Sequence, residues 1–242
     1  IGPINVLKKS DGIVKRQHVE DVAAELQRLE DAKKQAQAQL GALYEKALQE
    51  VGEVNAQIFE VHQMMLEDED YQDAIHSMIE TEELNAEYAV AVTGDNFAEI
   101  FANMDDEYMQ ARSADVKDIS NRLIRNLSGE EELDWAHMEP SIIVADDLTP
   151  SETVQMDKRK ILAFVTVHGS TNSHTAILAR MMNIPALIGV PVELDSLHSG
   201  TMGIVDGKDA VFCVDPDEAT IAAAHEMQAR AAEQKRLLAN YK

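Results

Sequence analysis

The sequence predicts an α/β domain combined with an all-helical subdomain, and three observations support this prediction. Between positions 19 and 128, apolar residues recur mostly at intervals of three, four or seven, the spacing of amphipathic helices. Beyond position 140, short apolar runs alternate with helical segments and turns, as in an α/β domain. The two patterns meet at Ser128-Gly129 and the acidic run 130–132, which marks the boundary between them.

Each part is expected to contain a definite series of elements. In the helical subdomain we expect a long helix over 19–51, a helix over 57–70 that ends in an acidic cluster, a helical pair over 73–92, a break at 93–95 and a last long helix over 97–127. In the α/β domain we expect strands at 4–7, 141–145, 161–167, 186–190, 202–205 and 210–214, a helical turn near 150–154 capped by Ser151, and a final helix from 217 toward Tyr241.

The composition restricts the kinds of partner and the cellular compartment that we expect for this protein. With 21 Lys and Arg against 44 Asp and Glu, the 242 residues carry a formal charge of −23, which argues against nucleic acid or an anionic membrane as the main partner and favours a basic protein. Acidity that serves solubility alone is the alternative. A single cysteine, Cys213, predicts a reducing cytoplasm and a buried strand position. The sequence shows no signal peptide and no apolar run of the roughly 18 residues that span a bilayer, so a soluble protein is expected.

His174 stands where a loop of small and polar residues becomes a helix. The first turn of a helix presents backbone N–H groups without intrahelical partners and carries partial positive charge, so it favours anions. An imidazole nitrogen in this position can attack a phosphoryl group and then carry it. Gly169, Ser170 and Ser173 leave room and supply hydroxyl groups. A histidine that merely caps its helix is the alternative that the residues leave open.

The run Gly169-Ser-Thr-Asn-Ser-His-Thr-Ala-Ile-Leu-Ala-Arg180, followed by Ile184-Pro-Ala-Leu-Ile-Gly189, resembles the phosphohistidine loop of swivelling domains in phosphoenolpyruvate-using enzymes. The family loop usually reads G-G-x-T-S-H, from which Ser170 and Asn172 depart. Three further runs resemble enzyme I of the phosphoenolpyruvate:sugar phosphotransferase system, and the resemblance extends over nearly the whole chain. These runs begin at Ile58-Phe-Glu, at Asp105-Asp-Glu-Tyr and at Asp147-Leu-Thr-Pro-Ser-Glu-Thr153.

The resemblance implies an α/β swivelling phosphohistidine domain, formed by 1–18 and 129–216, with an inserted all-α helical-bundle subdomain over 19–128 and a C-terminal linker helix over 217–242. It implies phosphoryl transfer through His174 to a histidine of the bacterial phosphocarrier protein HPr. Phosphoenolpyruvate and Mg²⁺ would bind a C-terminal domain that this sequence does not include. For this chain we therefore expect no cofactor, no bound metal and a monomer. Because enzyme I ordinarily begins with a further strand, the resemblance also implies that the sequence is trimmed at its N-terminus.

The resemblance also assigns roles to particular residues. His174 and Thr153 are the candidate catalytic residues, because in this family the threonine hydrogen-bonds the histidine ring and selects the reactive nitrogen. The candidate phosphoryl-loop residues are Gly169, Ser170, Asn172, Ser173, Thr175 and Arg180. The candidate HPr-binding residues are Glu60, His62, Met65, Leu66, Asp68, Glu69, Asp70, Tyr108, Arg112 and Lys117. From spacing alone, Met65 and Leu66 fit a hydrophobic core as well as a docking surface.

Other functions are less consistent with the sequence. A non-catalytic acidic interaction or regulatory module with a structural histidine remains the alternative of a different class. Pyruvate phosphate dikinase shares the loop but does not explain the helical motifs. A metal site at His168 and His174 lacks a third ligand at suitable spacing. A serine hydrolase built on Ser170 or Ser173 lacks a nucleophile elbow.

Overall fold

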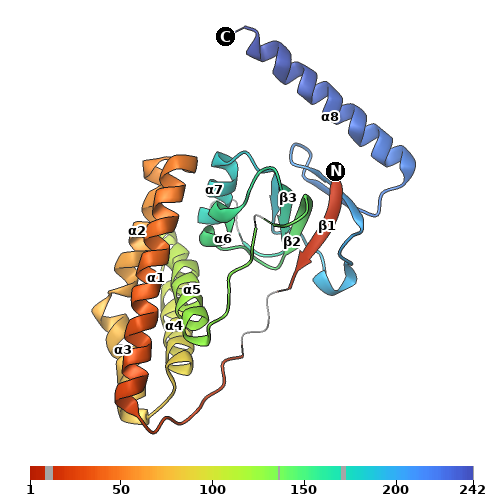
Figure 1. Cartoon of the computed structure of the whole chain (residues 1–242). Coiled ribbons are helices and arrows are strands. Elements are labelled where there is room, and N and C mark those ends of the chain that lie inside the picture. The colour runs from red at the N-terminus through yellow and green to blue at the C-terminus, as the bar shows by residue number, and fades with distance from the viewer. Residues whose placement is uncertain (9–12, 136, 170–172, 242) are drawn as a thin grey trace.

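The computed structural model describes residues 1–8, 13–135, 137–169 and 173–241, and it divides into a helical part and a mixed β-sheet with its own helices. Figure 1 shows the helices α1 to α5 lying side by side as a bundle next to the sheet. The chain leaves the sheet after its first strand, forms this bundle and returns as the second strand. The helical part is thus inserted between two strands that are neighbours in the sheet.

The bundle consists of α1 (Val22–Val51), α2 (Glu53–Leu66), α3 (Glu69–Glu82), α4 (Ala86–Ala102) and α5 (Glu107–Ser128). The long helix predicted over 19–51 is present, and it begins after Asp21, whose side chain accepts a hydrogen bond from the Ala24 N–H. Leu29, Ala36 and Leu40 on one face of α1 are fully buried, as the spacing predicts.

The predicted break at 93–95 is wrong, because α4 continues through Gly94. A Cβ atom at this position would lie within 2.7 Å of the Ser120 Cβ atom on α5, so the glycine permits a close approach of two helices rather than a turn. The helix predicted over 97–127 is instead interrupted between α4 and α5. Asp106 caps the start of α5, where its carboxylate accepts a hydrogen bond from the Tyr108 N–H.

Within the described residues the sheet has six strands in the order β4-β3-β2-β1-β5-β6. The strands are β1 (Gly2–Leu7), β2 (Ser141–Ala145), β3 (Ile161–Thr166), β4 (Ala186–Ile188), β5 (Met202–Asp206) and β6 (Val211–Val214). The first four are parallel, with Ile4 opposite Ile142, whereas β5 pairs antiparallel with β1 and β6 pairs antiparallel with β5. Cys213 lies on the edge strand β6 and is only half-buried, so its predicted burial is wrong.

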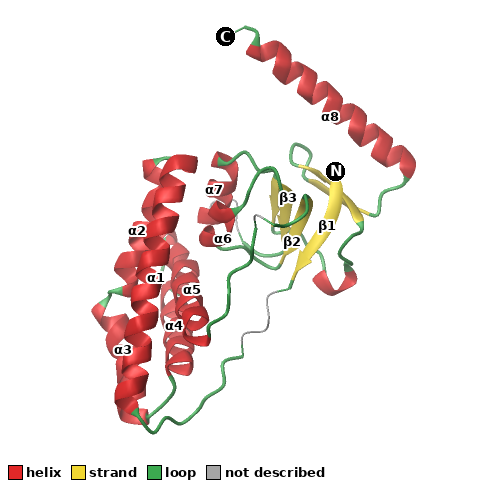
Figure 2. Ribbon diagram, viewed as in Figure 1, coloured by secondary structure: helices red, strands yellow, loops and turns green. Residues whose placement is uncertain are grey.

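Two short helices, α6 (Pro150–Gln155) and α7 (His174–Met181), lie between the sheet and the bundle (Figure 2). Alternate residues of β2 point to opposite faces of the sheet, so Ile143 joins the core shared with the bundle and Ile142 joins a second core on the other face. Because the first core is continuous from α1 to β3, it packs α6 against α1 and α7 against both α1 and α2.

The last helix, α8 (Glu218–Ala239), has no buried residue and projects away from the rest of the molecule (Figure 1). A 3₁₀ turn, η1 (Leu194–Ser196), precedes β5. None of the described helices is both long and apolar enough to cross a membrane.

Candidate active site

His174 is the first residue of α7, as the sequence predicts. The preceding residue, Ser173, has extended backbone angles, and its hydroxyl accepts a hydrogen bond from the Ala176 N–H at 3.2 Å. This cap fixes the point at which the loop becomes a helix. The His174 side chain is 35% exposed, so one edge of the ring is packed and the other is accessible.

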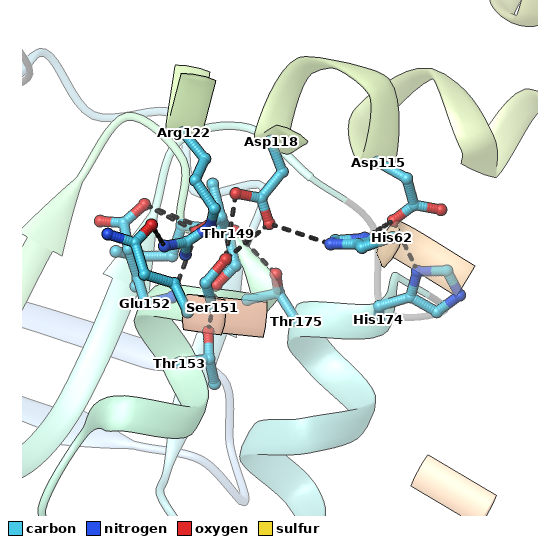
Figure 3. Close-up of polar contacts among 12 residues, drawn as sticks. His62, Asp115, Asp118, Arg122, Thr149, Ser151, Glu152, Thr153, His174 and Thr175 are labelled. Atoms are coloured by element: carbon cyan, nitrogen blue, oxygen red, sulfur yellow. Dashed lines mark hydrogen bonds and ion pairs between the residues drawn. The ribbon is translucent and has the colours of Figure 1, made fainter. Parts of the chain in front are cut away.

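The packed edge of the His174 ring meets a carboxylate from the helical part. Nδ1 of His174 lies 3.2 Å from Oδ1 of Asp115, which is on α5 (Figure 3). The pKa of Asp115 is raised by burial, but hydrogen bonds from His174 and His62 outweigh this and hold it at about 2. An ionised carboxylate can only accept hydrogen bonds, so Nδ1 of His174 carries the proton. The other nitrogen, Nε2, is therefore the one with a free lone pair, and it lies on the side of the ring turned away from Asp115.

The structure gives Thr153 a different role from the one that the resemblance implies. Its side chain is fully buried, and its hydroxyl donates to the backbone carbonyl of Thr149 at 2.9 Å. The ring nitrogen that Thr153 was expected to hold is bonded to Asp115 instead. In this structure the orienting group for His174 thus comes from α5 and not from α6.

The predicted cap at Ser151 is also wrong. Thr149 caps α6 in a reciprocal capping box, in which its hydroxyl accepts from the Glu152 N–H and the Glu152 carboxylate accepts from the Thr149 N–H, both at 3.2 Å. The Ser151 hydroxyl is therefore available for another partner. It lies 3.0 and 2.8 Å from the two carboxylate oxygens of Asp118, to which it can donate.

Four side chains, His62, Asp115, Asp118 and Ser151, form what we call the buried cluster (Figure 3). Nε2 of His62 lies 3.0 Å from Oδ1 of Asp115, and its Nδ1 lies 3.9 Å from Oδ2 of Asp118. His62 is 0% exposed, so its predicted contact with a partner protein is wrong. The buried cluster connects α2, α5 and α6, and through Asp115 it reaches His174 on α7.

A groove of about 290 Å³ opens beside His174 between α2, α5 and α7. Arg112 lies in its wall, where its guanidinium is 5.3 Å from the ring centroid of Tyr108 and Nη2 donates to the Tyr108 hydroxyl at 3.4 Å. The groove thus places a positive charge and an exposed aromatic ring near His174. Its other lining residues are Val54, Asn55, Gln57, Ile58, Val61, Ala111, Asp115, Ile177 and Leu178.

The predicted phosphoryl-loop residues have different environments in the structure. Gly169 has a φ of 105°, and a Cβ atom there would lie 3.2 Å from the Ile188 side chain, so the backbone requires glycine. Thr175 is buried and donates to the Leu148 carbonyl at 2.7 Å, which anchors α7 instead of facing a phosphoryl group. Arg180 is exposed in the last turn of α7, about 9 Å along the helix axis from His174. Ser170 and Asn172 lie outside the described residues.

The predicted partner-binding residues also divide by exposure. Leu66 is fully buried and its predicted contact is wrong, while Met65 and Arg112 are half-buried. The neighbouring Met64, which was not among the predicted contacts, is 65% exposed. The exposed members of the predicted set are Glu60, Asp68, Glu69, Asp70, Tyr108 and Lys117.

The described residues contain no group of three or more His, Cys, Asp or Glu side chains that could hold a metal ion. His168 instead pairs with Asp146, at 3.2 Å, on the exposed side of the sheet.

The sequence pattern did not single out Asp115 and Asp118, although α5 carries a signal that identifies them. Val116, Ile119 and Leu123 form the apolar stripe of this helix. Asp115, Asp118 and Arg122 repeat the same spacing one residue earlier, so they form a polar stripe directly beside the core. Charged residues in that register are buried on packing and need partners.

Two family models match this chain. Residues 1–112 match the family described as "PEP-utilising enzyme, N-terminal". Residues 137–210 match the family described as "PEP-utilising enzyme, mobile domain". Together they define the class as the N-terminal and mobile domains of phosphoenolpyruvate-utilising enzymes. The chain is 36% identical over 230 residues to a phosphoenolpyruvate-protein phosphotransferase of Priestia megaterium, and 34% identical over 244 residues to one of Haemophilus influenzae. These alignments cover 95% and 100% of the chain but 40% and 42% of the relatives, so the chain spans about 40% of their length.

Solved structures that resemble this chain carry names that agree with those of the relatives. A solution structure of Enzyme I (nEIt) matches with a TM-score of 0.76 and 32% identity, covering 96% of this chain and 94% of the other. The N-terminal domain of Enzyme 1 - Nitrogen matches with a TM-score of 0.63 over 94% of both chains, and its 24% identity shows a shared fold alone. The chain therefore belongs to the enzyme I family of phosphoenolpyruvate-protein phosphotransferases.

Proposed function

We propose that this chain carries a phosphoryl group on Nε2 of His174 and exchanges it with a histidine of the phosphocarrier protein HPr, as the N-terminal part of enzyme I. The observation that carries the proposal is the contact between Nδ1 of His174 and the ionised Asp115. This contact directs the proton to Nδ1 and leaves the lone pair of Nε2 for the reaction.

In the transfer, the lone pair of Nε2 forms a bond to phosphorus while the bond from phosphorus to the donor atom breaks. The bonding pair leaves with the donor, which is the enolate oxygen of phosphoenolpyruvate or a ring nitrogen of phosphorylated HPr. The phosphoryl oxygens and their charge move with phosphorus. Nδ1 keeps its proton, and its hydrogen bond to Asp115 balances the positive charge that develops on the His174 ring.

A swivelling arrangement fits the connectivity of the molecule. His174 belongs to α7 of the sheet part, whereas Asp115 belongs to the inserted bundle, so His174 can leave Asp115 when the two parts move relative to each other. We propose that 1–18 and 129–216 form the moving phosphohistidine domain, that 19–128 dock HPr, and that 217–242 link to a further domain. Phosphoenolpyruvate and Mg²⁺ would bind in that further domain, which corresponds to the part of the relatives beyond the matched span.

Exposed side chains at the end of α2 and the start of α3 support HPr as the partner. Exposed Met64 lies close in sequence to the carboxylates of Asp68, Glu69 and Asp70, which together suit a basic protein with an apolar contact area. We place this chain in the cytoplasm and propose that it is a monomer, with no nucleic acid or membrane as a partner.

The test is intact and peptide mass spectrometry after mixing the chain with phosphorylated HPr at neutral to basic pH. We expect a gain of one phosphoryl group that maps to His174, and no gain in the His174→Ala variant. The matched control is His168→Ala, because His168 lies in the same loop region but pairs with Asp146 away from Asp115. Labelling that survives His174→Ala would overturn the proposal. A folded wild-type chain that accepts no phosphoryl group would favour a non-catalytic interaction module.

A further inference from the structure

His62 lies between two carboxylates in a fully buried position. Its Nε2 is 3.0 Å from Oδ1 of Asp115, and its Nδ1 is 3.9 Å from Oδ2 of Asp118. Side-chain exposure is 0% for His62 and 2% for each carboxylate. Asp115 and Asp118 are three residues apart on α5, so both face α2 across the same helical turn.

Two buried carboxylates on one turn repel each other and are costly to ionise unless a positive charge lies between them. The hydrogen bonds around them are those of ionised groups. Asp115 can accept from both His62 and His174, and both oxygens of Asp118 lie within hydrogen-bonding distance of the Ser151 hydroxyl. The cation one turn further along α5, Arg122, lies 2.8 Å from Glu132 instead.

The second nitrogen of His62 shows where the compensating proton belongs. Nδ1 is buried, has no hydrogen-bond partner among the residues that the structure describes, and faces Oδ2 of Asp118. A lone pair on Nδ1 would point at a carboxylate oxygen, which is repulsive. A proton on Nδ1 makes the same approach attractive. The Phe59 ring, whose centroid is 6.0 Å from that of His62 in an edge-to-face arrangement, adds no charged group.

We propose that His62 is a buried imidazolium with a proton on each ring nitrogen, and that it is a positioning residue for His174. It holds Asp115 in the orientation in which the carboxylate accepts the Nδ1 proton of His174, and Asp118 keeps His62 charged. The part that concerns His174 rests on the proposed function, whereas the protonation of His62 does not. Because Ser151 of α6 and His174 of α7 both contact these carboxylates, the buried imidazolium also joins the bundle to the sheet part.

The first arm of the test is nitrogen-15 NMR of the histidine rings in the unphosphorylated wild-type chain. We expect both ring nitrogens of His62 to carry a proton at neutral pH. A His62 ring with a single proton at neutral pH would overturn the proposal. This arm needs no phosphoryl transfer, so it stands even if the chain proves unable to accept a phosphoryl group.

The second arm uses Asp118→Asn, which removes the charge facing His62 without touching His174. We expect His62 to lose one proton at neutral pH, the Nδ1–H form of His174 to become less populated, and phosphoryl uptake from phosphorylated HPr to slow by about tenfold or more. The pH profile of uptake should shift as well, which a purely structural role would not produce. The matched control is Asp31→Asn, which changes an exposed carboxylate on α1 that accepts a hydrogen bond from Gln27.

Circular dichroism and HPr binding establish that the Asp118→Asn chain is folded. If that variant does not fold, Ser151→Ala provides the second variant, because it removes one hydrogen bond to Asp118 and leaves both charges in place. It should leave His62 doubly protonated and weaken the effect on uptake to a few-fold. An Asp118→Asn chain that is folded, keeps both protons on His62 and takes up phosphoryl groups at the wild-type rate would contradict the proposal.

Discussion

Nδ1 of His174 lies 3.2 Å from Oδ1 of Asp115, and this contact joins two residues that are 59 positions apart in the sequence. His174 opens a helix of the sheet part, whereas Asp115 lies on α5 of the inserted bundle. The ring orientation of His174 therefore depends on how the two parts are packed together. Any motion that separates them also releases Nδ1 from its carboxylate.

Asp115 should make the stability of the chain depend on acid pH. Its pKa is lowered from 3.8 to about 2 in the folded protein, so its contribution is present above about pH 4 and is lost as the pH falls through 2. We expect the carboxylate to contribute about 2 kcal/mol to the free energy of unfolding at neutral pH. Urea unfolding of wild type and Asp115→Asn from pH 7 to pH 2 measures this, and the difference between them should shrink below about pH 4.

The control for this pH dependence is Asp31→Asn, which changes an exposed carboxylate. Its unfolding free energy should stay within about 0.5 kcal/mol of wild type. A difference between wild type and Asp115→Asn that is independent of pH would show that Asp115 acts through packing and not through its charge.

Thr153 and Asp115 should differ in their effects on the His174 ring. Thr153 hydrogen-bonds the Thr149 carbonyl, so Thr153→Val should weaken α6 by about 1 kcal/mol and leave the Nδ1–H form of His174 populated as in wild type. Asp115→Asn should lower that population and slow phosphoryl uptake. Nitrogen-15 NMR of the two variants compares them directly. A changed His174 ring in Thr153→Val, with Asp115→Asn unchanged, would restore the role that the resemblance implies for Thr153.

Met64 should contribute to HPr binding through its exposed side chain. It is 65% exposed on α2, and burying it against a partner would remove apolar surface from water. We expect Met64→Ser to weaken HPr binding by about tenfold, or about 1.4 kcal/mol, in a calorimetric titration. Met227→Ser is the matched control, because Met227 is 54% exposed on the projecting α8. Equal losses in the two variants would argue against docking on α2.

Gly94 and Gly41 should respond to alanine in opposite directions. Both lie inside helices, where alanine is favoured over glycine by about 1 kcal/mol. At position 94 a Cβ atom would lie 2.7 Å from the Ser120 Cβ atom, whereas at position 41 the nearest atom is a flexible Gln63 nitrogen at 3.6 Å. Thermal unfolding should show Gly94→Ala destabilised by about 1–3 kcal/mol and Gly41→Ala slightly stabilised. A stabilised Gly94→Ala would mean that α4 and α5 can separate at little cost.

The elements that sequence predicts well are those with strong local signals. The spacing of α1, the boundary at Gly129 and the strand Ser141–Ala145 follow from periodicity and turn residues. The break wrongly predicted at 93–95 shows the limit of this approach. Glycine there satisfies a contact with Ser120 that lies 26 positions away, and local patterns carry no information on such contacts.

The sequence by itself determined that His174 opens a helix after a loop of small and polar residues, because helix starts depend on a few adjacent residues. Only the tertiary structure decided which group holds the ring of His174. Asp115, His62 and Asp118 come from two helices of an inserted bundle, and they meet because the apolar stripes beside them are buried in one continuous core. The same packing buries His62 and Leu66, which the resemblance places at a docking surface, and leaves Met64 exposed. Burial depends on which helices meet, so it is settled by the fold and not by the helix pattern.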